Sequence, residues 1–417
     1  MTQSSIVIIG AGQAGFQAAA SLREQHHTGR IVLVGDEAHA PYQRPPLSKA
    51  YLFDEETGDV ALRTDAFFAQ QRIELATGRR AVAIDRAERR VCFDDGWTLE
   101  YDHLVLATGA CNRLLTVPGA DLRNVFYLRT LDDAKALREQ LATARSLMVI
   151  GAGFVGLELA AGAAKLGMST TVLDVSDRPM ARGLSKTMAG VISREHQKLG
   201  MQLRFETRVT RLLGDDDGRV RGVETSDGQI LPAELVVIGI GVVPNVELAA
   251  SCELAIEDGI AVDERLLTSD PQISAIGDVA AHVNPYPHGQ RVRLESVQNA
   301  SDQARCVAAR LVGRTSPYEA VPWFWSYQGD LKLQMTGLAR TGCEEVVRGE
   351  LDSAACAVFS FHDGRLACVE TLNRPVEHML ARRLLATRAT VTARQVADPS
   401  FDLKSLLPKP GAGAAVR

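Results

Sequence analysis

Residues 6–15 read Ile6-Val7-Ile8-Ile9-Gly10-Ala11-Gly12-Gln13-Ala14-Gly15, an apolar run that ends in a glycine-rich turn. The apolar run predicts a buried strand, and the pattern of residues 16–25 predicts a helix directly after the turn. In such a unit Gly10 makes the turn, Gly12 lets a pyrophosphate approach the backbone, and Gly15 lets helix and strand pack closely. The N-terminus of the helix then faces the phosphates.

The unit is completed by a second predicted strand, residues 31–34, which is followed by Asp36. A carboxylate at this spacing can accept hydrogen bonds from an adenosine ribose. The same arrangement returns later in the chain, where residues 147–150 lead into a second glycine-rich turn, a helix through Ala164 and a strand, residues 170–173. The residues of this second unit that correspond to the first are Gly151, Gly153, Gly156 and Asp174. Two complete units predict two dinucleotide sites.

Two weaker signals accompany these units. Residues 104–109 form an apolar run, a predicted strand, that ends in Ala-Thr-Gly, and residues 274–279 form a second such predicted strand, which contains Gly277 and ends in an acid, Asp278. In this order, the four patterns resemble the two-dinucleotide flavoprotein family, in which an NAD domain is inserted into an FAD domain. The resemblance extends from about residue 5 to about residue 405. It implies an α/β fold with two Rossmann-like dinucleotide-binding domains, a glutathione-reductase-like architecture, and a C-terminal α+β domain.

The domain boundaries follow from this resemblance. We expect an FAD-binding domain in two pieces, 1–112 and 242–320, and an NAD-binding domain at 113–241. A C-terminal domain is expected at 321–407, because short alternating runs predict an antiparallel sheet there, with a helix near residues 378–386. Residues 408–417, with proline and glycine among small residues, are expected to form a flexible tail.

Composition excludes several classes of protein. No apolar run approaches the 18 or so residues that a membrane span needs, and the N-terminus lacks the basic start of a signal peptide, so a cytoplasmic protein is expected. The formal charge of −5 gives no reason to expect a nucleic-acid partner. The seven cysteines form no Cys-x-x-Cys pair and no metal-ligand spacing, so buried thiols and no metal site are expected.

The segment after the first ribose acid separates the branches of the family. Disulfide reductases carry a cysteine pair there, and the oxidase and peroxidase branch carries a single cysteine; this chain has neither. It reads Pro41-Tyr42-Gln43-Arg44-Pro45-Pro46-Leu47-Ser48-Lys49, which resembles bacterial ferredoxin reductases that serve aromatic-ring dioxygenases and haem-thiolate (cytochrome P-450) monooxygenases. Residues 294–300 and 322–326 match the same branch. One departure is Tyr327, where the branch has an aspartate, so any contact of that acid is in doubt here.

The resemblance implies roles for individual residues. The FAD contacts would be Gly10, Gly12, Ala14, Gly15, Asp36, Lys49, Val82, Thr108, Gly109, Arg129, Asp278, Val297 and Trp323. The NAD contacts would be Gly151, Gly153, Gly156, Glu158 and Asp174. Lys49 would lie near flavin N5, and Glu158 would face the nicotinamide and pair with Lys49, which makes these two the candidate catalytic residues. Asp174 would favour NADH, because a carboxylate accepts a 2′-hydroxyl and repels a 2′-phosphate, although Arg178 lies nearby in the sequence.

The implied reaction transfers hydride from NADH to FAD and then single electrons to a small acidic two-iron two-sulfur ferredoxin. Residues 374–417 contain eight basic and three acidic residues, a net charge of +5 in a chain whose total is −5, so a basic docking surface is expected there. Arg305 and Lys404 are its candidate residues, and Arg310 would extend it. A rubredoxin reductase, an NADH oxidase and a signalling flavoprotein resembling apoptosis-inducing factor remain as alternatives. The identity of the ferredoxin and the oligomeric state stay open.

Overall fold

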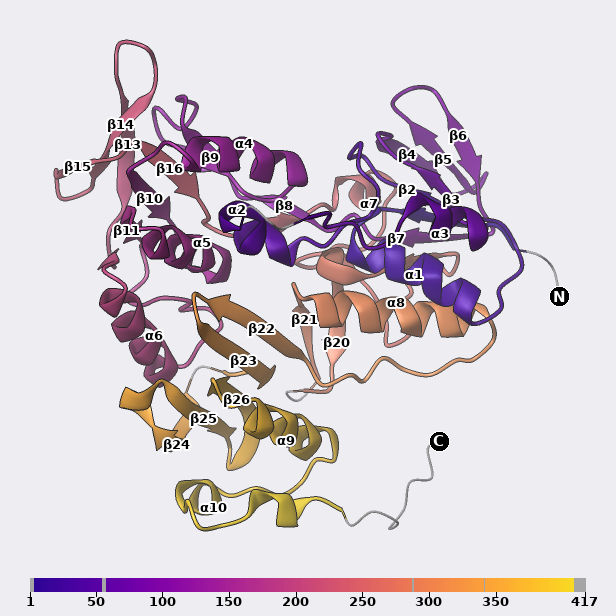
Figure 1. Ribbon diagram of the computed structural model, residues 1–417. Helices are drawn as coiled ribbons and strands as arrows, with labels where there is room; N and C mark the ends of the chain where they lie inside the picture. The colour runs from indigo at the N-terminus through magenta and orange to yellow at the C-terminus, as the bar shows by residue number, and fades with distance from the viewer. Residues whose placement is uncertain (1–3, 55–57, 287–288, 341, 409–417) are drawn as a thin grey trace. The chain divides into compact units, whose positions relative to one another are not determined.

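The computed structural model describes residues 4–54, 58–286, 289–340 and 342–408 (Figure 1). The chain divides into two compact units. Unit 1 comprises residues 1–44, 58–111 and 242–320, and unit 2 comprises residues 45–57, 112–241 and 321–417. Residues 45–57, which the sequence places in the first FAD-domain piece, group with unit 2, and so do the central and C-terminal regions; the expected domain boundaries stay a prediction.

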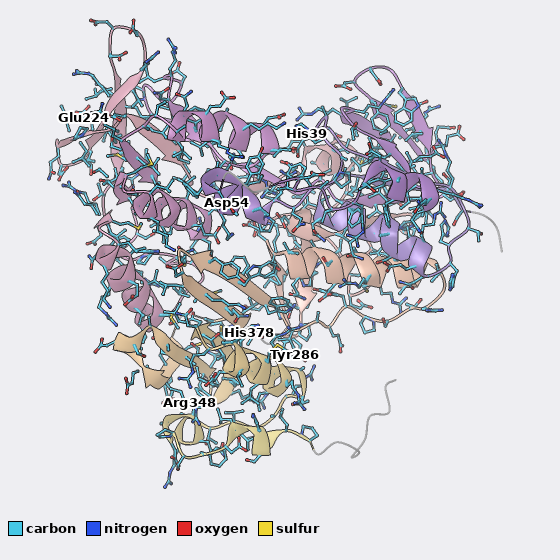
Figure 2. All side chains as sticks on the ribbon, viewed as in Figure 1. His39, Asp54, Glu224, Tyr286, Arg348 and His378 are labelled. Carbon is cyan, nitrogen blue, oxygen red and sulfur yellow. The ribbon has the colours of Figure 1, made fainter. Side chains whose placement is uncertain are left out.

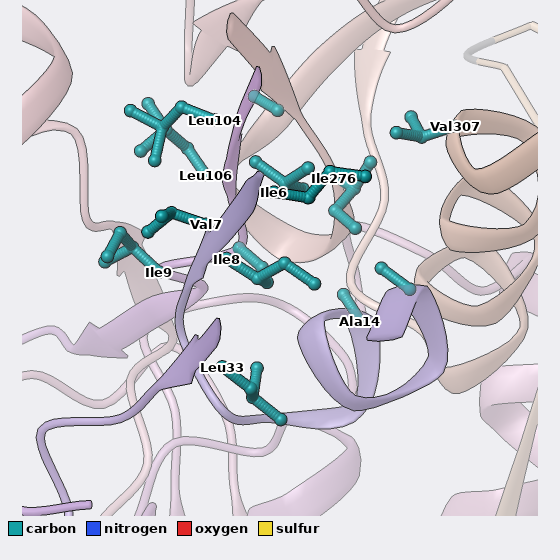
Figure 3. Packing of buried hydrophobic residues seen from close by; sticks show 14 of the residues in the cluster. Ile6, Val7, Ile8, Ile9, Ala14, Leu33, Leu104, Leu106, Ile276 and Val307 are labelled. Carbon is teal, nitrogen blue, oxygen red and sulfur yellow. The ribbon is translucent and has the colours of Figure 1, made fainter. Parts of the chain in front are cut away.

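Unit 1 is built on a parallel five-stranded sheet in the order β19-β7-β1-β2-β3. The strands are β1 (Ile6–Ile9), β2 (Ile31–Val34), β3 (Glu74–Ala76), β7 (His103–Leu106) and β19 (Ile273–Ala275). Helix α1 (Gln13–Glu24) follows β1 and packs against α8 (Val297–Leu311). Figure 3 shows the β1 side chains among Leu33, Leu104 and Leu106. Because both faces of β1 are covered, all four of its residues are buried, which explains the uninterrupted apolar run.

Smaller sheets complete unit 1. They are β4 (Ala81–Asp85) with β5 (Arg90–Phe93) and β6 (Thr98–Glu100), β18 (Ile260–Ala261) with β20 (Ala280–Asn284) and β21 (Gln290–Arg293), and the pair β8 (Ala110–Asn112) and β17 (Val242–Pro244). A short helix, α3 (Asp65–Gln70), precedes β3, and another, α7 (Glu247–Ser251), lies between β17 and β18 in sequence. The run expected as one strand over 274–279 instead ends at Ala275, and Gly277–Val279 forms a 3₁₀ turn. Gly277 has a φ of +77°, and its N–H donates to Gln303 Oε1 at 2.7 Å, so the backbone leaves the sheet there.

Unit 2 contains a second parallel sheet in the order β12-β11-β10-β16-β9. Its strands are β9 (Val125–Tyr127), β10 (Ser146–Ile150), β11 (Ser169–Leu173), β12 (Gln202–Arg204) and β16 (Leu235–Ile238). The helices are α4 (Leu131–Leu141), α5 (Phe154–Lys165) and α6 (Lys186–Lys198), and β13 (Val209–Gly214), β14 (Val220–Thr225) and β15 (Ile230–Pro232) form an antiparallel sheet.

Residues 45–54 pack against α4 and α5, the helices that accompany this second parallel sheet. They form a 3₁₀ turn, η1 (Pro45–Ser48), and a short helix, α2 (Ala50–Phe53). The ring of Phe53 occupies the space beside Gly162 on α5, where a Cβ would lie 2.2 Å from the ring. Arg138 on α4 donates to the carbonyl of Asp54, and its guanidinium lies 5.6 Å from the centre of the Tyr51 ring. These contacts explain why residues 45–54 belong to unit 2.

The C-terminal part of unit 2 is an antiparallel sheet in the order β22-β23-β26-β25-β24. Its strands are β22 (Trp323–Gln328), β23 (Leu331–Gly337), β24 (Glu344–Glu350), β25 (Ala355–His362) and β26 (Arg365–Leu372), followed by α9 (Pro375–Ala386), α10 (Ala393–Ala397) and a 3₁₀ turn, Leu403–Leu406. Arg348, labelled in Figure 2, donates to four carbonyls of residues 396–401 and fixes the final segment on β24. The expected strands and helix of this region are confirmed, and so is the predicted fold class.

Two expectations on composition can be checked. Within the described ranges, no helix is both long enough and apolar enough to cross a membrane. The expectation of buried thiols holds only for Cys356 and Cys368. Cys111 is exposed and the other four cysteines are half-buried.

Candidate functional site

The first glycine-rich turn lies between β1 and α1. A Cβ on Gly10 would lie 2.1 Å from the Ala107 carbonyl oxygen, and one on Gly15 would lie 1.9 Å from the Gly10 carbonyl oxygen, so protein packing requires both glycines. A Cβ on Gly12 would meet no protein atom within 4 Å. The α1 N-terminus has no side-chain cap and no acidic residue in its first turn. Open space over Gly12 and uncapped N–H groups are what a bound pyrophosphate needs.

The second turn, between β10 and α5, repeats this geometry. Gly151 and Gly156 are packed against backbone oxygens, with hypothetical Cβ distances of 2.3 and 2.4 Å, whereas a Cβ on Gly153 would meet only one atom, at 4.0 Å. The N-terminus of α5 also lacks a side-chain cap and a first-turn acid. The residues of both turns therefore fit a dinucleotide phosphate, and the middle glycine of each is unexplained by protein packing alone.

The other FAD candidates of unit 1 are Asp278, Thr108, Gly109, Val297, Val82 and Asp36. Gly277 approaches Ala14 so closely that a Cβ would lie 2.9 Å from that of Ala14, which brings Asp278 to the first turn. Thr108 and Gly109 are held by Asn245, whose side chain donates to the Thr108 carbonyl at 2.7 Å and whose N–H donates to the Gly109 carbonyl at 3.0 Å. Val297 is the first residue of α8, and Val82 is 50% exposed. Asp36 is exposed, with Arg80 at 3.7 Å.

One charged group near these residues was not foreseen from the sequence. Arg44 donates to the Tyr42 hydroxyl at 2.8 Å and forms an ion pair with Glu37, and the Tyr42 hydroxyl donates to the same carboxylate at 2.6 Å. These charges, together with Asp278, hold the pKa of Arg44 above its usual range although burial opposes them. Arg44 is therefore a fixed cation in unit 1.

Unit 2 contains the two candidate catalytic residues, and the expected ion pair is present. Lys49 Nζ lies 2.6 Å from Glu158 Oε2. The Glu158 side chain is only 4% exposed and Lys49 is 22% exposed. Lys49 also donates to the Pro45 carbonyl at 3.1 Å, which leaves one of its three ammonium hydrogens for a further acceptor.

Three residues that the sequence did not single out complete the surroundings of Glu158. Ser48 donates to Oε2 at 2.6 Å, and Ser326 donates to Oε1 at 2.5 Å. Gln328 donates to Ser326 Oγ at 2.7 Å and to the Phe154 carbonyl at 3.1 Å. Ser48 and Ser326 lie inside the segments 41–49 and 322–326 that match the branch, and Gln328 lies two residues beyond, so membership of these motifs was the only sequence signal available.

Asp174 lies at the end of β11, beside the second turn. Its Oδ2 accepts from the Ala152 N–H at 2.6 Å, and its Oδ1 accepts from the Ser176 N–H at 2.7 Å. Each oxygen retains a lone pair for a ligand. Arg178, the nearby arginine, is engaged by Asp177 at 2.7 Å and by the Ala181 carbonyl at 3.0 Å.

The remaining unit 2 candidates are Trp323 and Arg129. Trp323 lies 5.4 Å from the Trp325 ring and 5.8 Å from the His378 ring, and the guanidinium of Arg382 lies 4.4 Å over its face. Figure 2 shows His378 on α9. Arg129 precedes α4, and its N–H donates to Asp133 at 3.0 Å.

Two residues expected in or beside the basic docking surface have partners within the protein. Arg310 donates to Ser274 Oγ at 2.5 Å, and burial lowers its pKa, so its expected place in that surface is wrong. Arg374 is paired with Glu377. Arg305 is exposed beside Asp302, at 2.8 Å, and Arg383, Arg394 and Lys404 are also exposed. Lys409 and Arg417 lie outside the described residues, as does all of the expected tail except Pro408.

Comparison with known proteins places this geometry in a family. Residues 4–304 match the pyridine nucleotide-disulphide oxidoreductase model, and residues 323–407 match the reductase C-terminal model. Rhodocoxin reductase of Rhodococcus erythropolis is 53% identical, over 96% of this chain and 93% of its own.

Solved structures agree with this placement. The ferredoxin reductase for the CYP199A2 system of Rhodopseudomonas palustris is 46% identical with a TM-score of 0.94, over 97% of this chain and all of that one. The reductase in the covalent putidaredoxin reductase–putidaredoxin complex is 40% identical with a TM-score of 0.94, over 97% of this chain and 98% of that chain. The chain therefore belongs to the pyridine nucleotide-disulphide oxidoreductase family, in the branch of ferredoxin reductases that carry the reductase C-terminal domain.

Proposed function

We propose that this protein is an NADH-dependent ferredoxin reductase. FAD, when bound, accepts a hydride from NADH and releases the electrons singly to a small acidic two-iron two-sulfur ferredoxin, which serves a cytochrome P-450 monooxygenase or an aromatic-ring dioxygenase. The observation that carries the proposal is the ion pair of Lys49 with the buried Glu158, in a chain with two intact glycine-rich turns. No protein nucleophile is required.

The first turn is proposed to bind FAD. In unit 1 its backbone N–H groups would hold the pyrophosphate, Asp36 the adenosine ribose and Asp278 the ribityl chain, with backbone contacts from Val82 and Val297. Unit 1 would then correspond to the FAD-binding domain, expected at 1–112 and 242–320. In unit 2, Lys49, Arg129 and Trp323 are proposed as further flavin contacts, with the remaining N–H of Lys49 directed at the flavin near N5.

The second turn is proposed to bind NADH in the domain expected at 113–241. Gly151, Gly153 and Gly156 would admit its phosphates, and Asp174 would accept hydrogen bonds from its ribose hydroxyls. A 2′-phosphate would be repelled by Asp174, and Arg178 is already engaged by Asp177 and Ala181, which supports a preference for NADH. Glu158 would lie beside the nicotinamide and hold Lys49 in place.

The ferredoxin is proposed to dock on basic residues, of which Arg305 and Lys404 are the candidates. Support comes from their exposure, from the basic composition of residues 374–417, and from the redoxin complex that a related reductase forms. Attraction between an acidic ferredoxin and such residues weakens with salt, because the screening length falls from about 10 Å at 0.1 M to about 3 Å at 1 M.

Charge reversal tests this docking. Arg305→Glu or Lys404→Glu should raise the KM for ferredoxin and leave flavin reduction by NADH unchanged, with Arg265→Glu, an exposed arginine elsewhere in unit 1, as the control. If ferredoxin reduction is insensitive both to salt and to these reversals, electrons leave by another surface.

The expected cytoplasmic location stays a prediction.

The alternative activities are separated by one experiment on purified protein. Rapid flavin reduction by NADH with slow oxygen consumption supports a redoxin reductase, and comparing rubredoxin with a two-iron two-sulfur ferredoxin as acceptor separates the two redoxin classes. Fast oxygen consumption in the presence of NADH supports an NADH oxidase, and slow flavin reduction by NADH supports a signalling flavoprotein.

A further inference from the structure

We propose that Ser326 and Gln328 are positioning residues for hydride transfer, because they fix the carboxylate of Glu158 from the side opposite Lys49. This inference rests on the proposed function and extends it to β22, a strand of the C-terminal domain. The hydrogen bonds of the two side chains lead to Glu158 and to the Phe154 carbonyl rather than to Lys49, so their effect on the reaction is expected to pass through Glu158.

The donors and acceptors in this group can be assigned uniquely. The Phe154 carbonyl can only accept, so the atom of Gln328 that faces it must be the amide nitrogen. The same nitrogen donates to Ser326 Oγ, which leaves the serine proton for Glu158 Oε1. The chain of hydrogen bonds therefore runs in one direction, from Gln328 through Ser326 to the carboxylate.

The other oxygen of Glu158 is occupied from a different element. Oε2 accepts from Ser48 and from Lys49, both at 2.6 Å. With Ser326 on Oε1, the carboxylate has donors on both oxygens and its plane cannot rotate without breaking one of these bonds. A buried side chain whose partners fix its rotation holds its ion-pair partner at a defined position.

Strand alternation explains why this arrangement survives the departure at Tyr327. Ser326 and Gln328 are fully buried on one face of β22, whereas Tyr327 is 41% exposed on the other. Tyr327 pairs in register with Lys332, whose ammonium lies 6.0 Å from the centre of the tyrosine ring. The residue that differs from the branch pattern thus faces away from Glu158, whereas Ser326 and Gln328 lie on the opposite face of the strand.

The expected consequence is a loss of rate rather than of NADH binding. Ser326→Ala leaves Oε1 without its donor, and hydrogen bonds to charged groups are the strong ones, so we expect the limiting rate constant of flavin reduction to fall about tenfold. Gln328→Met, which removes the donor to Ser326 but leaves the serine in place, should produce a smaller fall in the same direction. For Ser326→Ala the dissociation constant of NADH should stay within about twofold, because Asp174 and the hydrogen bond from Gln328 to the Phe154 carbonyl are untouched.

Anaerobic stopped-flow reduction of the flavinated protein over a range of NADH concentrations separates the rate constant from the dissociation constant. Tyr327→Phe is the matched control, since it removes a hydroxyl from the next residue of the same strand. The decisive measurement is a double-mutant cycle with Glu158→Gln. If Ser326 acts through Glu158, Ser326→Ala should cause no further slowing in the Glu158→Gln background.

Two results would overturn the inference while leaving the proposed function intact. One is a wild-type protein that NADH reduces rapidly and whose rate Ser326→Ala and Gln328→Met do not change. The other is a slowing by Ser326→Ala that is equal in the two backgrounds or is shared by Tyr327→Phe. A wild-type flavin that NADH does not reduce would overturn both proposals together. If Ser326→Ala does not fold, Gln328→Met carries the same cycle with the same expectations.

Discussion

The buried carboxylate of Glu370 makes the stability of unit 2 depend on pH. Glu370 lies on β26 and is fully buried. Its carboxylate accepts from the N–H of Ser185 at 2.8 Å and also bonds the Ser185 hydroxyl, which caps α6 by accepting from the Met188 N–H. Burial raises the pKa of Glu370 from 4.5 to about 7, because the loss of water outweighs the two bonds from Ser185.

The direction of the effect follows from this pKa. Below about pH 4.5 both the native and the unfolded chain hold the proton, so Glu370 costs nothing. Between pH 4.5 and about 7 the unfolded chain releases the proton and the native chain keeps it, so the free energy of unfolding falls as pH rises. Each pKa unit corresponds to about 1.4 kcal/mol, so the loss reaches about 3 kcal/mol by pH 8.

Glu370→Gln removes this dependence. An amide mimics the protonated acid, since it can accept from the Ser185 N–H and donate to the Ser185 hydroxyl. The variant should be about as stable as wild type at pH 5 and about 3 kcal/mol more stable at pH 8. Hydrogen exchange of the α6 amides, with urea unfolding at both pH values, measures the difference, and comparison at equal pH cancels contributions from other groups.

Glu344→Gln is the control for loss of a charge from the same sheet, because Glu344 is exposed on β24, the edge strand of that sheet. It should show the same difference from wild type at both pH values. The reasoning is refuted if the difference between Glu370→Gln and wild type is also the same at pH 5 and pH 8.

Three further outcomes are expected. Lys49→Met should slow flavin reduction by NADH at least about tenfold in a folded, flavinated protein. An unchanged stopped-flow rate would show that Lys49 takes no part in hydride transfer. Gly12→Ala should weaken FAD retention and leave the melting temperature of the apoprotein unchanged. Gly10→Ala should lower that melting temperature, because the backbone at Gly10 has a φ of +109° and a Cβ there would meet a carbonyl oxygen. Calorimetry measures the melting temperature, and flavin release during dialysis measures FAD retention. Asp174→Ala should narrow the preference for NADH over NADPH in steady-state kcat/KM, and a wild type that uses NADPH equally well would contradict the role of Asp174.

The sheets could be predicted from sequence because their strands are buried on both faces. Residues 6–9 and 31–34 were located to the residue, since a continuous apolar run between turn signals is typical of a strand inside a parallel sheet. The strand expected over 274–279 was too long because Gly277 leaves the sheet through a bond to Gln303, 26 residues away. Such a long-range bond leaves no periodic signal.

The candidate site could be predicted only in part, because several of its contacts join residues that are far apart in the sequence. Lys49 and Glu158 were paired through a family resemblance, but the attachment of residues 45–54 to unit 2 depends on the fit of Phe53 beside Gly162, which no local pattern encodes. Ser326 reaches Glu158 from a residue 168 positions away in sequence. Arg310 was expected in the docking surface because it is a basic residue on a predicted helix, but its side chain donates to Ser274 instead.

Electron transfer from NADH through the flavin to a ferredoxin is measured most directly by mixing the anaerobic protein with NADH and then with a panel of two-iron two-sulfur ferredoxins that includes putidaredoxin. The flavin absorbance at about 450 nm reports both steps. The account predicts that NADH bleaches this absorbance rapidly and that at least one ferredoxin restores it by accepting single electrons faster than air-saturated buffer does. A flavin that NADH does not bleach, or one that oxygen reoxidises faster than every ferredoxin of the panel, would contradict it.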